Sequence, residues 1–363
     1  MSLSIGEPSK DIMKTDLKNL DQQGLIEFVE KLNQPAFRAR QLMAWLYRPG
    51  ITDFDQMTDL AKSFRQVLSE QAYISSFDNA VLERSGDGSV KFVFLLNDGH
   101  VIEAVLIPEA DRNTLCVSSQ VGCAMQCTFC LTGTMGFIRN LTPAEIVNQV
   151  CAAGDFLRRE PEEQLIGPRE VTNIVFMGMG EPLNNLENVL TSISILTEQK
   201  GLDFTGRRIT VSTCGIVPKM RHLGENSAVN LAVSLHAIDD ATRDKLMPIN
   251  KKYPIDRLLE ACRTYPMPKR RRIMFEYTLL EGINDSLEEA HELARKLRHI
   301  PCKINLLPYN ECEGLPYRSP DRKKLLAFQD VLRSYHYSVF IRTSRGADIA
   351  AACGQLAKKV NLS

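Results

Sequence analysis

The sequence has no apolar run that approaches the roughly 20 residues a membrane-spanning helix needs. Its first residues, MSLSIGEPSKDIMKTD, also have no hydrophobic core of the kind found in secretion signals. Both absences predict a protein that is neither membrane-inserted nor secreted. Net charge is lacking as well: 44 Lys and Arg balance 44 Asp and Glu, so any polyanion must be bound by local basic runs. No internal repeat or low-complexity tract is present.

What the chain does have is length, apolar content and cysteine. Its 363 residues are 44% hydrophobic, enough to bury the core of one large domain or of two to three small ones. Ten cysteines could form a disulfide framework in a secreted protein. Without an export signal we expect a reducing, cytoplasmic location, where clustered cysteines more often hold metal or perform chemistry.

The first part of the chain predicts two small units. Apolar residues recur at helical spacing in LIEFVEKL and FRARQLMAWLY, with Pro35 between them, which predicts a helical accessory domain over residues 1–75 that is expected to contact RNA. From Ala80 to Pro108 apolar and polar residues alternate around turns at Gly86-Asp87-Gly88 and Asn97-Asp98-Gly99. This pattern predicts a β-hairpin extension over residues 76–110.

After Thr114 short apolar runs alternate with amphipathic stretches. The apolar runs, each expected to be a strand, are TLCVSSQ, NIVFMGMGE, RRITVSTCG, NLAVSLHA, RIMFEYTLL and KINLLPYN. Six βα units predict an α/β protein with a partial or complete barrel over residues 111–345, although periodicity alone leaves a doubly wound open sheet possible. A last helix, KKLLAFQDVLRSYH, a strand-like SVFIRTSRG and a C-terminal segment (346–363) complete the chain.

Three cysteines follow the first of these strands in a CxxxCxxC arrangement, CAMQCTFC: Cys123, Cys127 and Cys130. Three thiolates on one loop can hold three irons of a [4Fe–4S] cluster and leave the fourth iron open to a cosubstrate. The alternative is a structural zinc site, which needs four ligands. Only Cys116 is near enough in sequence to supply the fourth.

Seven segments in one order resemble the RlmN-type adenosine C2 methyltransferases of bacterial 23S rRNA and tRNA. They are TLCVSSQVGCAMQCTFC, MGMGEPLNN, ITVSTCGIVP, VSLHA, LMPINKKYPI, KINLLPYN and AACGQL. The resemblance implies a partial (β/α)6 TIM-type radical S-adenosylmethionine (SAM) barrel with a [4Fe–4S] cluster on the three cysteines. It implies methylation of carbon 2 of adenosine at the peptidyl-transferase centre of 23S rRNA and 3′ of the anticodon in tRNA. A flavodoxin- or ferredoxin-type electron donor is implied too, and we expect a monomer.

The resemblance also assigns a SAM pocket. The residues that it implies are Gly180, Glu181, Ser212, Ser234, Leu235, His236 and Asn310. A small residue permits close backbone approach, and a carboxylate can accept hydrogen bonds from the SAM ammonium group. Taken singly, MGMGEP could be a strand-end turn that caps a helix, and His236 an ordinary structural histidine.

Three further residues carry the mechanism that the resemblance implies, with two SAM molecules per turnover. Cys353 takes a methyl group from the first SAM; a radical from the second removes hydrogen from that methyl, and the resulting carbon radical adds to adenine. Glu103 accepts the proton from carbon 2, and Cys116 releases the RNA by forming a disulfide with Cys353. Without the resemblance, both cysteines would be read as packing residues.

Other features stay open at this stage. Cys151, Cys214, Cys262, Cys302 and Cys312 are expected to be packing residues, although Cys214 or Cys312 could enter the pocket. Candidates for RNA contact are Lys269-Arg270-Arg271-Arg272, Arg207-Arg208, Arg322-Lys323-Lys324, Arg342, Arg345, Arg38, Arg40 and Arg48. Two alternative functions remain: a Cfr-type carbon 8 methyltransferase and a non-catalytic, zinc-stabilised RNA-binding protein.

Overall fold

The N-terminal region folds around a hydrophobic cluster of its own. The computed structural model describes residues 14–77 and 80–356. In the first of these ranges lie three helices and two short parallel strands: α1 (Gln22–Lys31), α2 (Phe37–Leu46), α3 (Lys62–Gln71), β1 (Thr15–Asp16) and β2 (Ala72–Tyr73). Helix α1 starts at Asp21, whose side chain accepts a hydrogen bond from the Gly24 N–H, and it buries Leu25 and Val29 one turn apart. The helices predicted here are therefore present.

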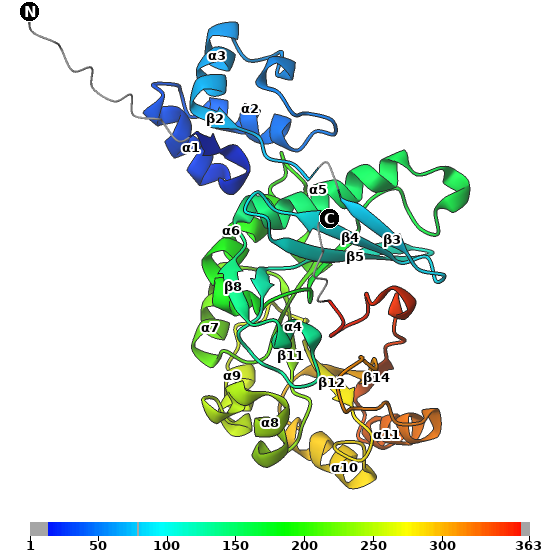
Figure 1. Cartoon of the computed structure of the whole chain (residues 1–363). Helices are drawn as coiled ribbons and strands as arrows, with labels where there is room; N and C mark the ends of the chain where they lie inside the picture. The colour runs from blue at the N-terminus through cyan, green and yellow to red at the C-terminus, as the bar shows by residue number, and fades with distance from the viewer. Residues whose placement is uncertain (1–13, 78–79, 357–363) are drawn as a thin grey trace, which may run out of the picture.

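A polar network joins this region to the rest of the chain. Lys18 Nζ donates to Asn148 Oδ1 at 2.9 Å, and Asn148 Nδ2 donates to Ser75 Oγ at 2.8 Å. Lys18 and Asn148 are both buried, so each depends on the other to satisfy its polar group. Figure 1 shows the blue N-terminal helices beside α5 (Pro143–Arg159), the helix that carries Asn148.

One ten-stranded sheet organises the remainder. Its antiparallel part contains β3 (Val81–Arg84), β4 (Val90–Leu95) and β5 (Val101–Glu109), and β5 runs antiparallel to β6. Its parallel part contains β6 (Arg112–Cys116), β9 (Asn173–Phe176), β10 (Ile209–Thr213), β11 (Asn230–Ser234), β12 (Ile273–Leu279), β13 (Cys302–Pro308) and β14 (Ser338–Ile341). The spatial order is β14-β13-β12-β11-β10-β9-β6-β5-β4-β3.

This order excludes the doubly wound alternative. Each new parallel strand is added on the same side of the previous one, whereas a doubly wound sheet reverses direction at a switch point. Within the described residues the two edge strands, β3 and β14, are not paired with each other, so the barrel is open. The predicted α/β partial barrel is confirmed, and β14 adds a seventh parallel strand to the six expected.

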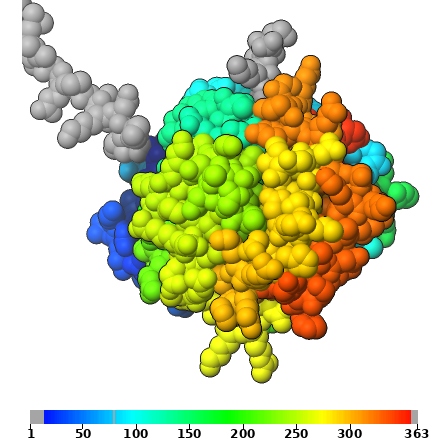
Figure 2. All heavy atoms as spheres, turned by 90° about the horizontal axis from the view of Figure 1, so that it is seen from below, coloured from blue at the N-terminus to red at the C-terminus, as the bar shows by residue number. Residues whose placement is uncertain are grey.

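Amphipathic helices cover the outside of the parallel strands. Besides α5 they are α6 (Leu186–Thr197), α7 (Val217–Asn226), α8 (Asp240–Leu246), α9 (Ile255–Arg263), α10 (Leu287–Lys296) and α11 (Arg322–Ser334). Sequence signals begin several of them: Thr142 and Glu145 form a capping box at α5, and Ser286 and Glu289 form one at α10. Seen from below, successive parts of the chain lie side by side in order, from green through yellow to orange (Figure 2).

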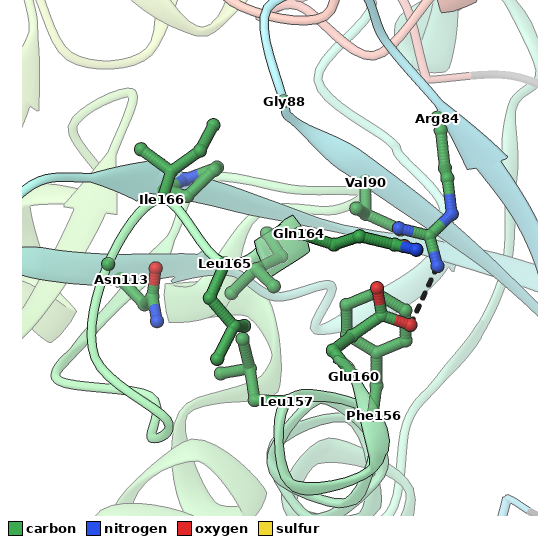
Figure 3. Close-up of a pocket in the computed structure, with 13 residues that line it drawn as sticks. Arg84, Gly88, Val90, Asn113, Phe156, Leu157, Glu160, Gln164, Leu165 and Ile166 are labelled. Carbon is green, nitrogen blue, oxygen red and sulfur yellow. Dashed lines mark hydrogen bonds and ion pairs between the residues drawn. The ribbon is translucent and has the colours of Figure 1, made fainter. Parts of the chain in front are cut away.

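The hairpin strands have two different faces. On one face Phe92 packs edge-on against Phe156 of α5, with ring centroids 5.4 Å apart. Figure 3 shows a pocket on this side, where Val90, Phe156 and Leu157 lie near the Arg84–Glu160 ion pair. Because side chains alternate along a strand, Lys91 of β4 points to the opposite face. In the described part of the chain, no helix has both the length and the apolarity needed to cross a bilayer.

The predicted unit boundaries remain predictions. Parts of three predicted units, residues 1–13, 78–79 and 357–363, lie outside the described residues.

Candidate active site

The predicted SAM-pocket residues gather at one edge of the sheet. Ser212 lies in β10, Ser234 ends β11, and Asn310 follows β13 by two residues. Gly180 lies in the turn after β9. Since these strands are parallel and adjacent, their carboxyl ends meet at the same edge, where barrel enzymes build their sites.

The Gly180-Glu181 turn is tightly packed. Gly180 has φ +98°, and a Cβ there would lie 2.5 Å from Cβ of Gln120, so this position requires glycine. Glu181 is buried, and its carboxylate accepts hydrogen bonds from the N–H groups of Leu183 (3.0 Å) and Cys214 (2.8 Å). The turn therefore has the capping role considered above, while each oxygen keeps a lone pair for a further donor.

His236 is held rigidly beside the cysteine loop. It has φ +55°, and its Nδ1 accepts a hydrogen bond from the Thr278 N–H at 2.9 Å, which leaves the proton on Nε2. The Phe129 ring stands edge-on to it, with centroids 5.1 Å apart. Burial lowers the pKa of His236 to about 3, so the ring is neutral at physiological pH.

A buried arginine that was not predicted organises the strand ends. Arg243 of α8 donates from Nε to the carbonyl of Leu235 and from Nη2 to the carbonyls of Cys214 and Ser234, at 2.8–3.0 Å. It thereby fixes the loops after β10 and β11 together. The sequence does not indicate this role of Arg243, because an arginine on an amphipathic helix normally faces solvent.

The three cysteines share one loop between β7 (Gln120–Gly122) and α4 (Leu131–Thr134). Hydrogen bonds fix the loop at both ends: the Cys123 N–H donates to Gly136 O (2.8 Å), and the Thr128 N–H donates to Leu246 O at the end of α8 (3.0 Å). Burial, together with the charges of the neighbouring thiols and of Glu181, raises the pKa of Cys123 to about 12 and that of Cys127 well above its usual value. Thiolates here consequently need a cationic partner.

Three thiols on one loop are the donor set of a [4Fe–4S] cluster with one open iron, whereas a structural zinc site needs four ligands. No group of three or more His, Cys, Asp or Glu side chains among the described residues is arranged to hold a metal ion. In a cuboidal cluster each thiolate binds a different iron, so the ligands stand farther apart than around one zinc. Cys123, Cys127 and Cys130 would hold such a cluster, with Glu181 and the strand ends beside it for SAM.

The C-terminal segment carries Cys353 to this loop. Gly354 O accepts a hydrogen bond from the Leu131 N–H at 2.8 Å, and Asn310 Nδ2 donates to Cys353 O at 3.1 Å. Asn310, a predicted pocket residue, thus also contacts the segment that bears Cys353. The Cys353 thiol is accessible to solvent but surrounded by protein, which raises its pKa to about 11 with contributions from Glu276 and Cys130.

Cys116 and Glu103 face the same space. Cys116 is buried at the end of β6, and its pKa is raised by burial and by the charge of Cys353. Glu103 of β5 is buried and forms an ion pair with Lys91, Nζ to Oε1 3.5 Å. All ten cysteines carry free thiols in this structure.

A second buried carboxyl, also not predicted, lies near Cys353. Glu276 of β12 accepts a hydrogen bond from Asn305 Nδ2 at 2.8 Å, and Arg342 Nε donates to Asn305 Oδ1 at 3.2 Å. Burial raises the pKa of Glu276 to about 7, against the lowering effects of Asn305 and Arg342. The sequence indicates this buried carboxyl only by placing one Glu within an apolar strand, IMFEYTL.

The remaining cysteines divide into two groups. Cys262 and Cys302 are buried within the main core, and Cys151 packs against it. Cys214 packs beneath the cysteine loop and touches Glu181, and Cys312 Sγ donates to Asn310 O at 3.2 Å. Cys214 and Cys312 thus lie beside two predicted pocket residues, Glu181 and Asn310, and whether either enters the pocket stays a prediction.

The basic residues predicted to contact RNA do not all lie near the site. Arg207 and Arg208 precede β10, and the run Lys269–Arg272 precedes β12, so both lie at the opposite edge of the sheet from Ser212 and Ser234. Arg342 is tied into the interior network with Asn305. In the N-terminal region, Arg48 stacks on Trp45 with its guanidinium 4.0 Å from the ring centroid.

Comparison with known proteins defines the class first. Residues 117–294 match the radical SAM superfamily, and residues 15–74 match the ribosomal RNA large subunit methyltransferase N-terminal domain. A radical SAM methyltransferase from Sphaerobacter thermophilus has the same fold, with a TM-score of 0.86, 44% identity, and coverage of 94% of this chain and 99% of that one.

Curated relatives give the family. The dual-specificity RNA methyltransferase RlmN of Desulfotalea psychrophila is 72% identical over 95% of both chains. That of Geobacter sulfurreducens is 53% identical over 95% of this chain and 93% of its own. The chain belongs to the RlmN family of radical SAM RNA methyltransferases. Membership implies a [4Fe–4S] cluster and SAM.

Proposed function

We propose that this enzyme methylates carbon 2 of adenosine, at the peptidyl-transferase centre of 23S rRNA and 3′ of the anticodon in tRNA. The observation that carries the proposal is that the segment bearing Cys353 docks on the cysteine loop, where Gly354 O accepts a 2.8 Å hydrogen bond from the Leu131 N–H next to Cys130. Cys116 belongs to the same group of thiols, because the charge of Cys353 raises the pKa of Cys116. A methyl-accepting thiol, a resolving thiol and a cluster ligand are the three groups that this chemistry needs together.

When bound, the cluster and SAM would supply the methyl group and the one-electron redox chemistry that the reaction needs. Cys353 accepts the methyl group and becomes S-methylcysteine. The carbon of this methyl group then forms the bond to adenine that attaches the RNA to the protein. Two SAM molecules are therefore consumed in each turnover. Seven residues border the space in which SAM is bound: Gly180, Glu181, Ser212, Ser234, Leu235, His236 and Asn310.

Release depends on the side chains of the chain itself. Glu103 accepts the proton from carbon 2, and the electrons of that C–H bond stay on the ring. The Cys116 thiolate attacks the sulfur of Cys353, so a disulfide bond forms while the carbon–sulfur bond breaks. The bonding pair passes to the former methylene carbon, and a proton then completes the methyl group.

The base must leave its stack to reach carbon 2 at the sheet edge, so we infer that the substrate is single-stranded or locally opened RNA. A flavodoxin- or ferredoxin-type protein in the cytoplasm supplies electrons, and the chain acts as a monomer. Arg48 and Trp45 of the N-terminal region form one surface suited to RNA.

The test is product analysis. Anaerobically reconstituted enzyme is incubated with SAM, reductant and unmodified rRNA fragment or tRNA, and the digested RNA is compared by mass spectrometry with 2-methyl- and 8-methyladenosine standards. We expect 2-methyladenosine from both RNAs. Only 8-methyladenosine would indicate the Cfr-type reaction, and no methylated adenosine from iron-loaded protein would contradict the proposal.

A further inference from the structure

Lys91 is a buried lysine that the mechanism above does not use. It lies in β4 within VKFVFL, and its side chain is only 4% exposed. Burying an ammonium group is unfavourable unless it is paired and hydrogen-bonded. Its partners therefore indicate why a lysine is kept in an otherwise apolar strand.

The Lys91 ammonium group contacts two carboxylates and one backbone carbonyl. Nζ lies 2.9 Å from Glu83 Oε2, 3.5 Å from Glu103 Oε1 and 2.6 Å from the carbonyl oxygen of Ile349. Glu83 belongs to the neighbouring strand β3 and is partly exposed, whereas Glu103 is buried. Ile349 ends η7 (Ala347–Ile349), four residues before Cys353.

Strand register places these groups on one face. Lys91 pairs with Val105 across β4 and β5, and Val105 pairs with Cys116 across β5 and β6. Glu103 is two residues before Val105, so its side chain points to the same side. Lys91, Glu103 and Cys116 therefore face the barrel interior together.

The segment before Cys353 is also tied to the hairpin. Gly346 N–H donates to Asp87 Oδ2 at 2.9 Å, and Asp348 accepts from Ser85 Oγ (2.5 Å) and from the Gly86 N–H (3.0 Å). These bonds hold η7 at the β3–β4 turn, and Lys91 adds a bond from inside the barrel. Figure 1 shows the red C-terminal segment beside the tips of the hairpin strands.

We propose that Lys91 is a positioning residue for the release step: its ammonium group, anchored on Ile349 O, orients Glu103 as the proton acceptor. The inference rests on the proposed function. In that step the C2–H bond breaks, its electron pair stays on the adenine ring, and the proton passes to the Glu103 carboxylate. The Lys91 ammonium lies beside the Glu103 carboxylate and holds it in place by a charge-assisted contact.

The consequence is specific to one step. Methylation of Cys353 does not use Glu103, whereas release of the RNA adduct does. Losing the ammonium group should therefore leave Cys353 methylated and the RNA covalently attached. A merely structural role for Lys91 would reduce both steps alike and trap nothing.

The experiment uses the full-length chain, produced in cells that contain substrate RNA and purified anaerobically under denaturing conditions. Lys91→Met and Lys91→Gln should each carry covalently bound RNA at least tenfold above wild type, with methylated Cys353 in the RNA-free fraction. Lys91→Arg, which restores a cation, should lower the adduct towards the wild-type level. If Lys91→Met does not fold, Lys91→Gln decides, since an amide can still donate to Ile349 O.

Glu83→Gln is the matched control, because it removes the same Lys91–Glu83 ion pair without taking the cation from Glu103, and it should not trap RNA. Cys116→Ala distinguishes a failure of the inference about Lys91 from a failure of the proposed function. If Cys116→Ala traps RNA and the folded Lys91 variants do not, the inference about Lys91 is wrong and the proposed function stands. If none of these variants traps RNA, the covalent mechanism itself fails.

Discussion

The backbone N–H of Leu131 donates a 2.8 Å hydrogen bond to the carbonyl oxygen of Gly354. Leu131 directly follows Cys130 of the cysteine loop, and Gly354 directly follows Cys353. One main-chain bond thus joins the proposed cluster site to the segment that bears the proposed methyl acceptor. A second bond reinforces it, from Thr132 Oγ1 to Leu356 O at 2.5 Å.

Gly354→Ala should weaken this docking. Gly354 has φ +83°, and a Cβ there would lie 3.4 Å from Phe129 O. An alanine in this left-handed conformation costs about 1–2 kcal/mol, so methylated Cys353, measured by mass spectrometry of the intact protein, should fall roughly tenfold. Gly282→Ala is the control: φ is +70°, no atom lies within 4 Å of its Cβ, and the position is outside the site. Equal methylation in the two variants would contradict the docking role.

Removing one thiol of the loop should abolish cluster binding. Cys123→Ala leaves only Cys127 and Cys130, so we expect the anaerobically purified variant to lose most of its iron, sulfide and brown colour. Cys262→Ala also removes a buried thiol, but one that packs in the main core. It should keep wild-type iron. Zinc with no sulfide in the wild-type protein would instead support the zinc-stabilised alternative.

Cys116→Ala should stop release of the RNA after the covalent bond has formed. Without the attacking thiolate, the carbon–sulfur bond to Cys353 persists. Gel analysis under denaturing, reducing conditions should show RNA attached to the purified variant, and a second change, Cys353→Ala, should remove it. Cys151→Ala, which alters a cysteine of α5 that interacts with Lys18 and Tyr47 of the N-terminal region, should purify free of RNA. RNA-free Cys116→Ala from cells that contain substrate would oppose the assigned role.

Glu276 should make stability depend on pH. Its folded-state pKa, raised to about 7 by burial, exceeds the usual value of 4.5. Between these values the folded state binds more protons than the unfolded state, so this carboxyl lowers the free energy of unfolding as pH rises. Glu276→Gln keeps an acceptor for Asn305 and cannot ionise. Urea unfolding should show the variant gaining stability relative to wild type from pH 5 to pH 8; parallel profiles would contradict this.

Local features of the site were predictable because their residues are neighbours in sequence. Cys123, Cys127 and Cys130 share a single loop, so their spacing alone indicates a common ligand. The parallel strands were predictable in the same way, since each apolar run precedes an amphipathic helix and the strand ends then share one edge. The pocket residues Ser212 and Ser234 followed from this regularity together with the family resemblance.

Other features were missed for a physical reason. Lys91, Arg243 and Glu276 are charged residues, which usually face solvent, and only their buried partners show that they do not. The edge on which a basic run lies depends on strand direction, which is why Arg207 and the Lys269–Arg272 run lie away from the strand ends that form the site.

The sequence by itself determined the βα periodicity, the cysteine loop and, through its ordered motifs, the family. Only the tertiary structure decided that the barrel is open and that the segment bearing Cys353 docks on the cysteine loop. It alone also decided that Lys91 contacts both Glu103 and Ile349. Helices, turns and loop ligands depend on interactions between near neighbours, whereas these contacts depend on strand register and on the path of the C-terminal segment, which arise only when distant parts of the chain pack together.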